Sequence, residues 1–385
     1  MIINGKRALA YIANVDNIQP IDGADNIELI SVLGWKVITK KFEFKIGDKC
    51  VFFEIDSKLP AAEWSEFMSH KHYKVKTMKL NKFGVVSQGL ALPISIFPEI
   101  KDMKTGTDVT DILKITYSEA EDNNRKNNNP NAKYDSMRAR HKKIFKKRWA
   151  KWMMKRSWGR KVMFFFFGRK KDKPKGFPSF ISKTDEERIE NVPWRLQEDK
   201  EWIATEKLDG TSCTYALERK GKNKFEYYVC SRNVRQQDRD QKCYHSSNIY
   251  WELEDKYNIE DYLKEYLIAN PTIEWVAIQG EGVGNVQGNP LKLKENDLYV
   301  FNLKDSVIGR YSSEKGKEII EQWGMKWVPV LGKVTLPDNM EDMKALADGN
   351  SIVNPEVIRE GIVYRSLDGS ESFKNVSNTF LLSKH

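Results

Sequence analysis

The stretch Ala204-Thr205-Glu206-Lys207-Leu208-Asp209-Gly210-Thr211-Ser212 carries a Lys-x-Asp-Gly motif. A lysine in such a motif can attack the α-phosphate of a nucleoside triphosphate and form a phosphoramidate. The same residues also suit an exposed Lys-Asp pair at a hairpin turn. Because about 0.1–0.2 chance matches to this short motif are expected in a chain of this length, its sequence context has to separate the two interpretations.

Five further segments follow Lys207, and most pair a strand-like apolar run with an acid, a cation or an aromatic residue. They are Ser231-Arg232-Asn233, Ile278-Gln279-Gly280-Glu281-Gly282, Leu298-Tyr299-Val300-Phe301-Asn302-Leu303, Glu360-Gly361-Ile362-Val363-Tyr364 and Ser372-Phe373-Lys374. Each segment alone is ordinary. All six motifs in this order are typical of the nucleotidyltransferase domains of polynucleotide ligases and capping enzymes, which favours the nucleophile over the hairpin turn.

The first 115 residues read as short strands separated by Gly and Pro turn signals. The predicted strands are 7–12, 27–32, 36–39, 49–55 and a fifth made of 85–86 with 90–92. Five short strands in about a hundred residues predict a small β-barrel of the OB type, a fold that commonly binds oligonucleotides.

The chain resembles the ATP-dependent RNA ligases, and most closely their fifth family, whose members carry an OB domain on the N-terminal side. The resemblance covers residues 1–115 and 177–382, including Gly34-Trp35-Lys36-Val37 and the lead-in Lys183-Thr184-Asp185-Glu186-Glu187-Arg188-Ile189. It implies an α+β protein with an OB-fold barrel at 1–115, a basic linker or insertion at 116–175, and an ATP-grasp-like nucleotidyltransferase domain of antiparallel sheets with helices at 176–385.

Charge marks the insertion. The 385 residues contain 64 Lys plus Arg and 54 Asp plus Glu, a net charge of +10. Residues 138–175 hold 17 of those cations and one acid, so this segment carries 17 − 1 = +16 and the rest of the chain 10 − 16 = −6. Phe145, Trp149, Trp152 and Met153 share one face at helical spacing. This amphipathic helix could pack against a domain, contact nucleic acid through Lys146, Lys147 and Arg148, or bind a membrane surface.

Several classes of protein are disfavoured. No apolar run approaches the roughly 20 residues of a membrane-spanning helix, and the N-terminus lacks a secretory signal pattern. The four cysteines (Cys50, Cys213, Cys230, Cys243) contain no CxxC pair, and the five histidines show no metal-ligand spacing. We therefore expect a reduced, soluble, intracellular protein of the cytoplasm.

The resemblance implies catalytic roles. Lys207 would be the nucleophile, and Lys374 a nearby cation that contacts the α-phosphate and disfavours a second positive charge on Lys207. Asp209, Glu281 and Glu360 would surround a catalytic Mg²⁺ or Mn²⁺, directly or through water, because Mg²⁺ binds few carboxylates and keeps several waters.

The resemblance also implies how the nucleotide is held. Glu206 would read the adenine amino group, and Phe301 would stack on the base. Arg232 would contact the ribose and the RNA 5′-phosphate, Glu281 and Glu360 would lie beside the nucleotide, and Gly210 would permit close backbone approach. One position departs from the family: some RNA ligases have a second lysine where this chain has Val376. Lys384, Lys292 and Lys294 are the candidates for that role.

The implied reaction has three steps. Lys207 attacks ATP to give lysyl-AMP, AMP passes to an RNA 5′-phosphate, and a 3′-OH attacks the adenylylated end. Repair of nicked RNA duplexes by a monomeric enzyme is the expected task, although the sequence leaves a single-stranded substrate open. A GTP-dependent capping-type enzyme and a non-catalytic OB-fold RNA-binding protein are the alternatives. Only eleven residues follow Lys374, which disfavours the C-terminal OB domain of capping enzymes.

Overall fold

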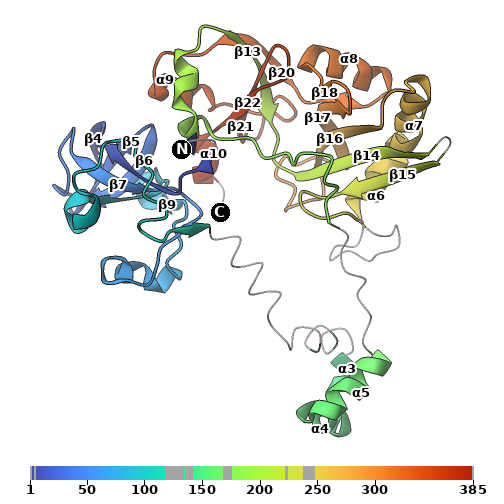
Figure 1. Cartoon of the computed structure of the whole chain (residues 1–385), viewed down its shortest axis with the longest axis horizontal. Coiled ribbons are helices and arrows are strands. Elements are labelled where there is room, and N and C mark those ends of the chain that lie inside the picture. The colour runs from blue at the N-terminus through green and yellow to red at the C-terminus, as the bar shows by residue number, and fades with distance from the viewer. Residues whose placement is uncertain are drawn as a thin grey trace.

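The computed structural model describes residues 2–3, 6–117, 134, 137, 142–167, 176–221, 224–236 and 248–383. Its N-terminal part is built on two three-stranded antiparallel sheets, in the orders β11-β7-β3 and β4-β5-β6 (Figure 1). The strands of these sheets are β3 Ala10–Asn14, β4 Asn17–Pro20, β5 Ile27–Val32, β6 Trp35–Lys40, β7 Lys49–Phe53 and β11 Leu90–Pro93. Shorter strands are β1 Ile2–Ile3, β2 Lys6–Arg7, β8 Ser57–Lys58, β9 Met78–Leu80, β10 Val85–Ser87 and β12 Thr116–Tyr117.

One apolar core joins the two sheets of this barrel. Tyr11 and Phe52 from one sheet pack with Ile30, Trp35 and Val37 from the other, and all five are buried. The alternation of apolar residues along these strands therefore faces a common interior. The strands predicted at 7–12, 27–32, 36–39 and 49–55 are present, with the first shifted to β3. The predicted fifth strand is wrong, because residues 85–86 belong to β10, which pairs with β9, and residues 90–92 belong to β11, which pairs with β7. β4 was not predicted because its polar sequence lacks an apolar alternation.

The C-terminal part contains two larger sheets. The first is four-stranded, in the order β20-β13-β21-β22, and the second is six-stranded, in the order β15-β14-β16-β17-β18 with β19 beside β17. Their strands are β13 Glu201–Lys207, β14 Thr211–Gly221, β15 Lys224–Cys230, β16 Trp275–Val283, β17 Asp297–Asp305, β18 Gly309–Arg310, β19 Lys326–Trp327, β20 Val330–Thr335, β21 Gly361–Ser366 and β22 Ser372–Val376.

Helices cover the outer faces of these sheets. The helices of this part are α6 Ile249–Tyr257, α7 Ile259–Ala269, α8 Ser313–Gln322, α9 Met340–Leu346 and α10 Asn378–Ser383. Leu253, Leu263 and Ile320 bring α6, α7 and α8 into the core of the six-stranded sheet. Met343 brings α9 into the core of the four-stranded sheet. The predicted α+β class is confirmed.

The Lys-x-Asp-Gly motif connects the two sheets. Lys207 is the last residue of β13 in the four-stranded sheet, and Thr211 is the first of β14 in the six-stranded sheet. β13 and β14 are therefore not partners in a hairpin, and the alternative of an exposed Lys-Asp pair at a hairpin turn is wrong. Crossing from one sheet to the other places Lys207 between them.

The barrel touches the four-stranded sheet and its surroundings. The guanidinium of Arg188 lies 5.8 Å from the ring centroid of Trp35 in β6. At the preceding turn, a Cβ on Gly34 would lie only 2.2 Å from Cγ of Met340 in α9, so glycine allows this close approach. Helix α10 also contacts β10. The N-terminal barrel is therefore packed against the part of the C-terminal region that carries Lys374.

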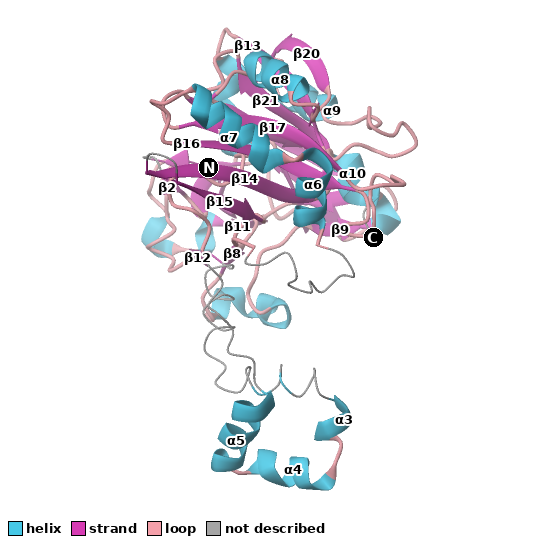
Figure 2. Cartoon of the chain, turned by 90° about the vertical axis from the view of Figure 1, so that its right-hand side faces the viewer, coloured by secondary structure: helices cyan, strands magenta, loops and turns pink. Residues whose placement is uncertain are grey.

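The basic segment forms α3 Lys142–Phe145, α4 Arg148–Lys155 and α5 Ser157–Phe167, which lie apart from both larger parts in Figures 1 and 2. Phe145, Ala150 and Met163 are buried in a small cluster made only of residues from this segment. Packing of the predicted aromatic face against a domain is therefore wrong for the described residues. Trp149 and Trp152 are about half exposed, because α4 turns Ala150, Met153 and Met154 toward α5 instead.

None of the described helices combines the length and apolarity needed to cross a membrane. Cys50, Cys213 and Cys230 are buried free thiols, as expected, and Cys243 lies outside the described residues.

Candidate active site

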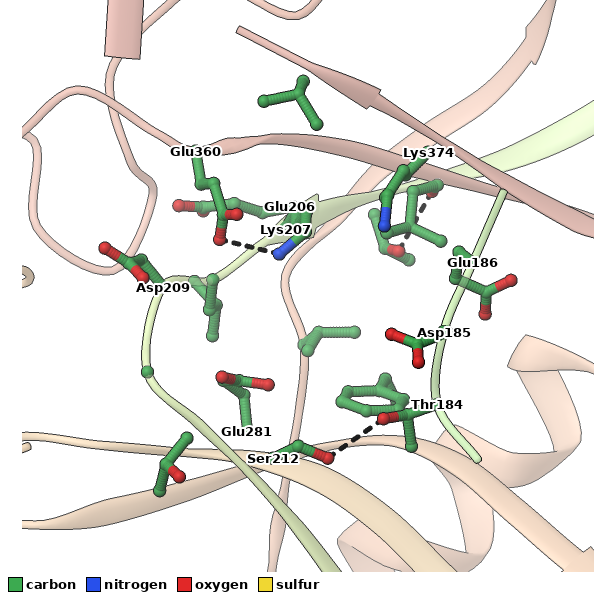
Figure 3. A pocket seen from close by; sticks show the side chains of 18 of the residues that line it. Thr184, Asp185, Glu186, Glu206, Lys207, Asp209, Ser212, Glu281, Glu360 and Lys374 are labelled. Carbon is green, nitrogen blue, oxygen red and sulfur yellow. Dashed lines mark hydrogen bonds and ion pairs between the residues drawn. The ribbon is translucent and has the colours of Figure 1, made fainter. Parts of the chain in front are cut away.

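A cavity of about 430 Å³ lies between the two C-terminal sheets and contains most of the predicted site residues. The four-stranded sheet and its loops contribute Glu206, Lys207, Glu360 and Lys374, and the six-stranded sheet contributes Glu281 and Phe301. Figure 3 shows Lys207 and Lys374 pointing into the same space, with Glu360, Asp209 and Glu281 around it. Six motifs that are dispersed over more than 160 positions therefore meet at one place.

Lys207 is paired with an acid. Its Nζ lies 2.7 Å from Oε2 of Glu360, the residue immediately before β21. Backbone register explains the approach, because Lys207 of β13 pairs with Gly361 of β21. Burial acts to lower the pKa of Lys207, but Glu360, Glu281 and Asp209 outweigh it and raise that pKa. Without a divalent cation among them, these acids favour the ammonium form of Lys207.

The three carboxylates around Lys207 form a negatively charged pocket. Burial, with repulsion from Glu360 and Asp209, raises the pKa of Glu281 to about 8, although Lys207 opposes the shift. An all-oxygen donor set fits a hard divalent cation, which would relieve this repulsion. Among the residues that the structure describes, no three such side chains converge closely enough to ligate one ion. The arrangement therefore suits a metal that retains much of its water.

Lys374 occupies the opposite wall and has an unusual electrostatic environment. Burial, followed by repulsion from Lys207 and Arg188, lowers the pKa of Lys374 to about 8. Its backbone N–H donates to the carbonyl of Glu187 over 2.7 Å, which aligns the lead-in segment with β22. The two lysines repel each other. This repulsion lowers the pKa of Lys374 but not that of Lys207, because Lys207 has more acids around it.

Glu206 has one satisfied and one free oxygen. Its side chain is buried in β13, and Oε2 accepts a hydrogen bond of 2.8 Å from the backbone N–H of Ile352. Oε1 is buried and has no hydrogen-bond partner among the described residues. Burial raises the pKa of this carboxyl, opposed by hydrogen bonds from Ser351 and Ile352. A buried acceptor without a donor is costly, so Glu206 is prepared to bind a donor from a ligand.

Phe301 lines the same cavity from the middle of β17. The guanidinium of Arg365, in β21, lies 5.7 Å from its ring centroid and donates to Oγ1 of Thr205 over 3.1 Å. Arg365 is buried, and burial lowers its pKa to about 10. The ring of Phe301 is therefore fixed by a buried cation, which gives an aromatic surface of defined orientation beside the cavity.

Arg232 lies at the exposed rim. It follows β15 and donates a 2.6 Å hydrogen bond to Oδ1 of Asp185 in the lead-in segment. Oγ of Ser212 and Oγ1 of Thr184 are 3.0 Å apart, which ties the same segment to β14 (Figure 3). The lead-in segment thus forms a wall of the cavity and holds an arginine at its mouth.

Gly210 fits the narrow crossing between the sheets. A Cβ at this position would lie 2.4 Å from the carbonyl oxygen of Gly282 in β16. A backbone atom cannot yield as a flexible side chain would, so any larger residue must displace the connection that carries Lys207 and Asp209. Contact with β16 is therefore a reason for glycine at this position that the sequence did not indicate.

Other predicted residues lie elsewhere. Val376 lines the cavity, but Lys292 and Lys294 do not, and Lys384 lies outside the described residues. The further cations that line the cavity are Arg188 and Arg365. Lys146 and Lys147, in the turn between α3 and α4, and Arg148, at the start of α4, are exposed and do not line it.

Sequence reasoning gave no role to Arg188 or Arg365. Arg188 forms a backbone bridge with Lys374, and its Nη1 is buried with no hydrogen-bond partner in the described part of the chain. The only indication in the sequence that Arg188 belongs to the site was its position in the lead-in segment. Arg365 ends the predicted strand that follows Glu360, where nothing in the local pattern separates a site residue from an exposed arginine.

Two family models match the chain. An OB-fold domain model matches residues 9–94, and an RNA ligase model matches residues 200–379. No curated protein matches it. The prediction of an OB barrel followed by a ligase domain is thereby confirmed.

Solved structures of Naegleria gruberi RNA ligase are similar over nearly the whole length. An apo form has 30% sequence identity and a TM-score of 0.68, and covers 99% of each chain. A variant with ATP and Mn and another with AMP and Mn have the same identity and TM-score, and each covers 98% of this chain and 99% of the other. With the cavity described above, these similarities show that the chain belongs to the RNA ligase family.

Proposed function

We propose that this RNA ligase uses ATP and a divalent metal to join 3′-OH and 5′-phosphate ends at nicks in RNA duplexes, in the course of RNA repair. One observation carries the proposal: Lys207 lies in a cavity between two sheets, 2.7 Å from Glu360, with Glu281, Asp209 and Lys374 around it. The solved relative with ATP and Mn supports the choice of cofactors.

Lys207 performs the covalent step. Its Nζ forms a bond to the α-phosphorus of ATP, the bond from that phosphorus to the bridging oxygen breaks, and pyrophosphate leaves while Nζ loses its proton. The ammonium of Lys374 stabilises negative charge that develops on the α-phosphate. An oxygen of the RNA 5′-phosphate then attacks the phosphorus of the bound AMP, and the P–N bond to Nζ breaks. The 3′-OH attacks the phosphorus of the RNA 5′-phosphate and loses its proton, the pyrophosphate bond breaks, and AMP leaves.

Asp209, Glu281 and Glu360 would hold the metal, Mg²⁺ or Mn²⁺, in part through water. When bound, the metal offsets the negative charge of these carboxylates, favours the amine form of Lys207 and stabilises charge on the phosphate. The same carboxylates raise the pKa of Lys207 when no metal is among them, which is consistent with this role.

The remaining residues position the nucleotide and the RNA end. The free Oε1 of Glu206 accepts from the adenine amino group, and Phe301 stacks on the base. Glu281 and Glu360 also lie beside the nucleotide, and Gly210 keeps the backbone close to it. Arg232, at the exposed rim, contacts the ribose and the RNA 5′-phosphate. This arrangement disfavours a capping-type enzyme, because guanine has a keto oxygen where adenine has its amino group.

Substitutions made in the Naegleria enzyme support these assignments by their spacing. Two solved variants replace a lysine and an aspartate two positions after it, as Lys207 and Asp209 are spaced. Two others replace a glutamate and a lysine that are as far apart in sequence as Glu360 and Lys374.

The organisation of the chain supports a duplex substrate. We propose an OB domain at 1–115, a basic insertion at 116–175 and the ligase domain at 176–385, acting together as a monomer. The OB barrel packs against the ligase domain near Lys374, so an RNA bound in the cavity can extend onto it.

A sealing assay tests the proposal. A 5′-phosphorylated RNA strand and a 3′-OH strand are supplied either annealed side by side on a complementary RNA or without that complement. We expect the nicked duplex to be joined at least ten times faster, and Lys207→Ala to join neither. Equal or faster joining of the unannealed strands would refute the preference for nicks without refuting ligation.

A further inference from the structure

We infer that the helices of the basic segment form a binding site for unpaired RNA, on which bases stack and phosphates pair with cations. This inference rests on the proposed function, because it concerns RNA of the same substrate outside the paired region that contains the nick. The site consists of exposed rings and cations between residues 146 and 166, on the turn that precedes α4 and on α4 and α5. We call this surface the aromatic-basic face.

The rings of this face are exposed although the segment has a core of its own. Phe145, Ala150 and Met163 are buried in that core. Side chains left outside it are Trp149, Trp152, Trp158, Phe165 and Phe166, which are 48% to 82% exposed. Exposed apolar groups gathered in this number mark an interaction surface rather than a folding requirement. The Trp152 and Trp158 rings touch edge to face, with centroids 6.1 Å apart, so the two helices share one surface.

Cations alternate with these rings. Residues three or four positions apart lie side by side on a helix, and Trp152, Trp158 and Phe165 each have a Lys or Arg of the same helix at such a distance. The guanidinium of Arg156 lies 3.9 Å from the ring centroid of Trp152. Residues 142–167 contain no acid at all, and no acidic side chain in the described part of the chain pairs with this face. The face therefore attracts an anionic partner along its whole length.

This alternation fits an unpaired strand better than a duplex. A single strand offers a base to stack on a ring and a phosphate to pair with a cation at each nucleotide. In an A-form duplex the bases are stacked on one another and side chains cannot enter the deep major groove, so the rings would stay in water. A bilayer would favour cations separated from apolar groups on opposite sides of a helix, rather than a guanidinium lying on an indole.

The test measures binding of the full-length protein to labelled RNA that lacks both a 5′-phosphate and a free 3′-OH, so that no joining occurs. A single-stranded oligouridylate is compared with a blunt duplex of equal length, by fluorescence anisotropy. We expect tighter binding of the single strand. Combined Trp149→Ala, Trp152→Ala and Trp158→Ala should weaken it about 100-fold, since each lost stack costs a factor of about five or more.

Three controls separate stacking from charge and from folding. Trp→Phe at the same three positions keeps the rings and should restore most of the affinity. Trp194→Ala removes a similarly exposed tryptophan of the ligase domain and should change nothing. Lys146→Gln, Lys147→Gln and Arg148→Gln together should lower the salt slope of binding by about 2, because each phosphate contact contributes about 0.7.

Several outcomes would overturn the inference. Unchanged single-strand binding by the triple alanine variant would show that the rings do not stack, and equal loss with the phenylalanine variant would show a structural effect. Equal binding of the duplex would remove the preference for unpaired RNA. Ring-dependent binding to anionic phosphatidylserine vesicles, without ring-dependent RNA binding, would assign the face to membranes. Lysyl-AMP formation needs no RNA, so its persistence in all variants distinguishes failure here from failure of the proposed function.

Discussion

Replacing Glu206 by glutamine should impair the reaction with ATP and improve the reaction with a nucleotide that has a keto oxygen in place of the adenine amino group. The carboxylate of Glu206 uses Oε2 to accept from the backbone N–H of Ile352 and leaves Oε1 buried and free. In Glu206→Gln the amide oxygen keeps the bond to Ile352, so the amide N–H₂ points to the position of Oε1. A donor then faces the adenine amino group, which is also a donor.

The magnitude follows from the two losses. A hydrogen bond to a charged group contributes about 1.5–3 kcal/mol, and a buried polar group left without a partner costs about 1–3 kcal/mol. Their sum, about 2.5–6 kcal/mol, corresponds to a decrease of roughly 10² to 10⁴ in kcat/KM for lysyl-AMP formation with ATP. Inosine triphosphate carries a keto oxygen in place of the amino group, so the variant should use it better than the wild type does.

The assay counts acid-stable label transferred to the protein from each α-labelled nucleotide under single-turnover conditions. Glu201→Gln, at the exposed start of the same strand, is the matched control and should leave the rate of label transfer from both nucleotides unchanged. Retention of ATP use within threefold by Glu206→Gln, or equal losses with both nucleotides, would refute the proposed contact with the base.

Three further predictions concern charge and backbone fit. Burial lowers the pKa of Lys374 to about 8, so its positive charge and its contribution to the rate are lost as the pH rises through that value. Lys374→Arg should therefore move the alkaline decline of single-turnover adenylylation to higher pH. A decline at the same pH in both proteins would contradict this assignment. Glu360→Gln should raise the Mn²⁺ concentration needed for half-maximal adenylylation about tenfold or more, since it removes one carboxylate from the proposed metal pocket; an unchanged metal titration would exclude Glu360 from it. Gly210→Ala should slow adenylylation about 100-fold, because its Cβ meets the carbonyl of Gly282, while circular dichroism retains the wild-type secondary structure; a wild-type rate would show that the connection can yield.

The sequence was most informative where the pattern was local. The strand predicted at 27–32 coincides with β5, and its inward residues Ile30 and Val32 are fully buried. The strand predicted around Phe301 is the centre of β17. Alternation and β-branched residues specify such strands before any tertiary contact is considered.

Tertiary contacts account for what could not be predicted. Arg188 becomes a site residue because the lead-in segment pairs with β22 and packs under Trp35, a contact across more than 150 positions. The pKa of Lys207 depends on three acids that the fold brings together: Asp209 between β13 and β14, Glu281 in β16 and Glu360 just before β21. The helical spacing of Trp149 and Trp152 predicts that both are buried. Instead α5 packs against the adjacent face of α4, so both tryptophans remain about half exposed.

The central claim is that Lys207 forms a covalent bond to AMP. Its most direct measurement is mass spectrometry of the protein after incubation with ATP and Mg²⁺, followed by peptide mapping of the modified residue. We predict one acid-stable AMP adduct on the peptide that contains Lys207, absent from Lys207→Ala and not formed from GTP. An adduct on another residue, an adduct from GTP alone, or no adduct with either nucleotide would contradict the account.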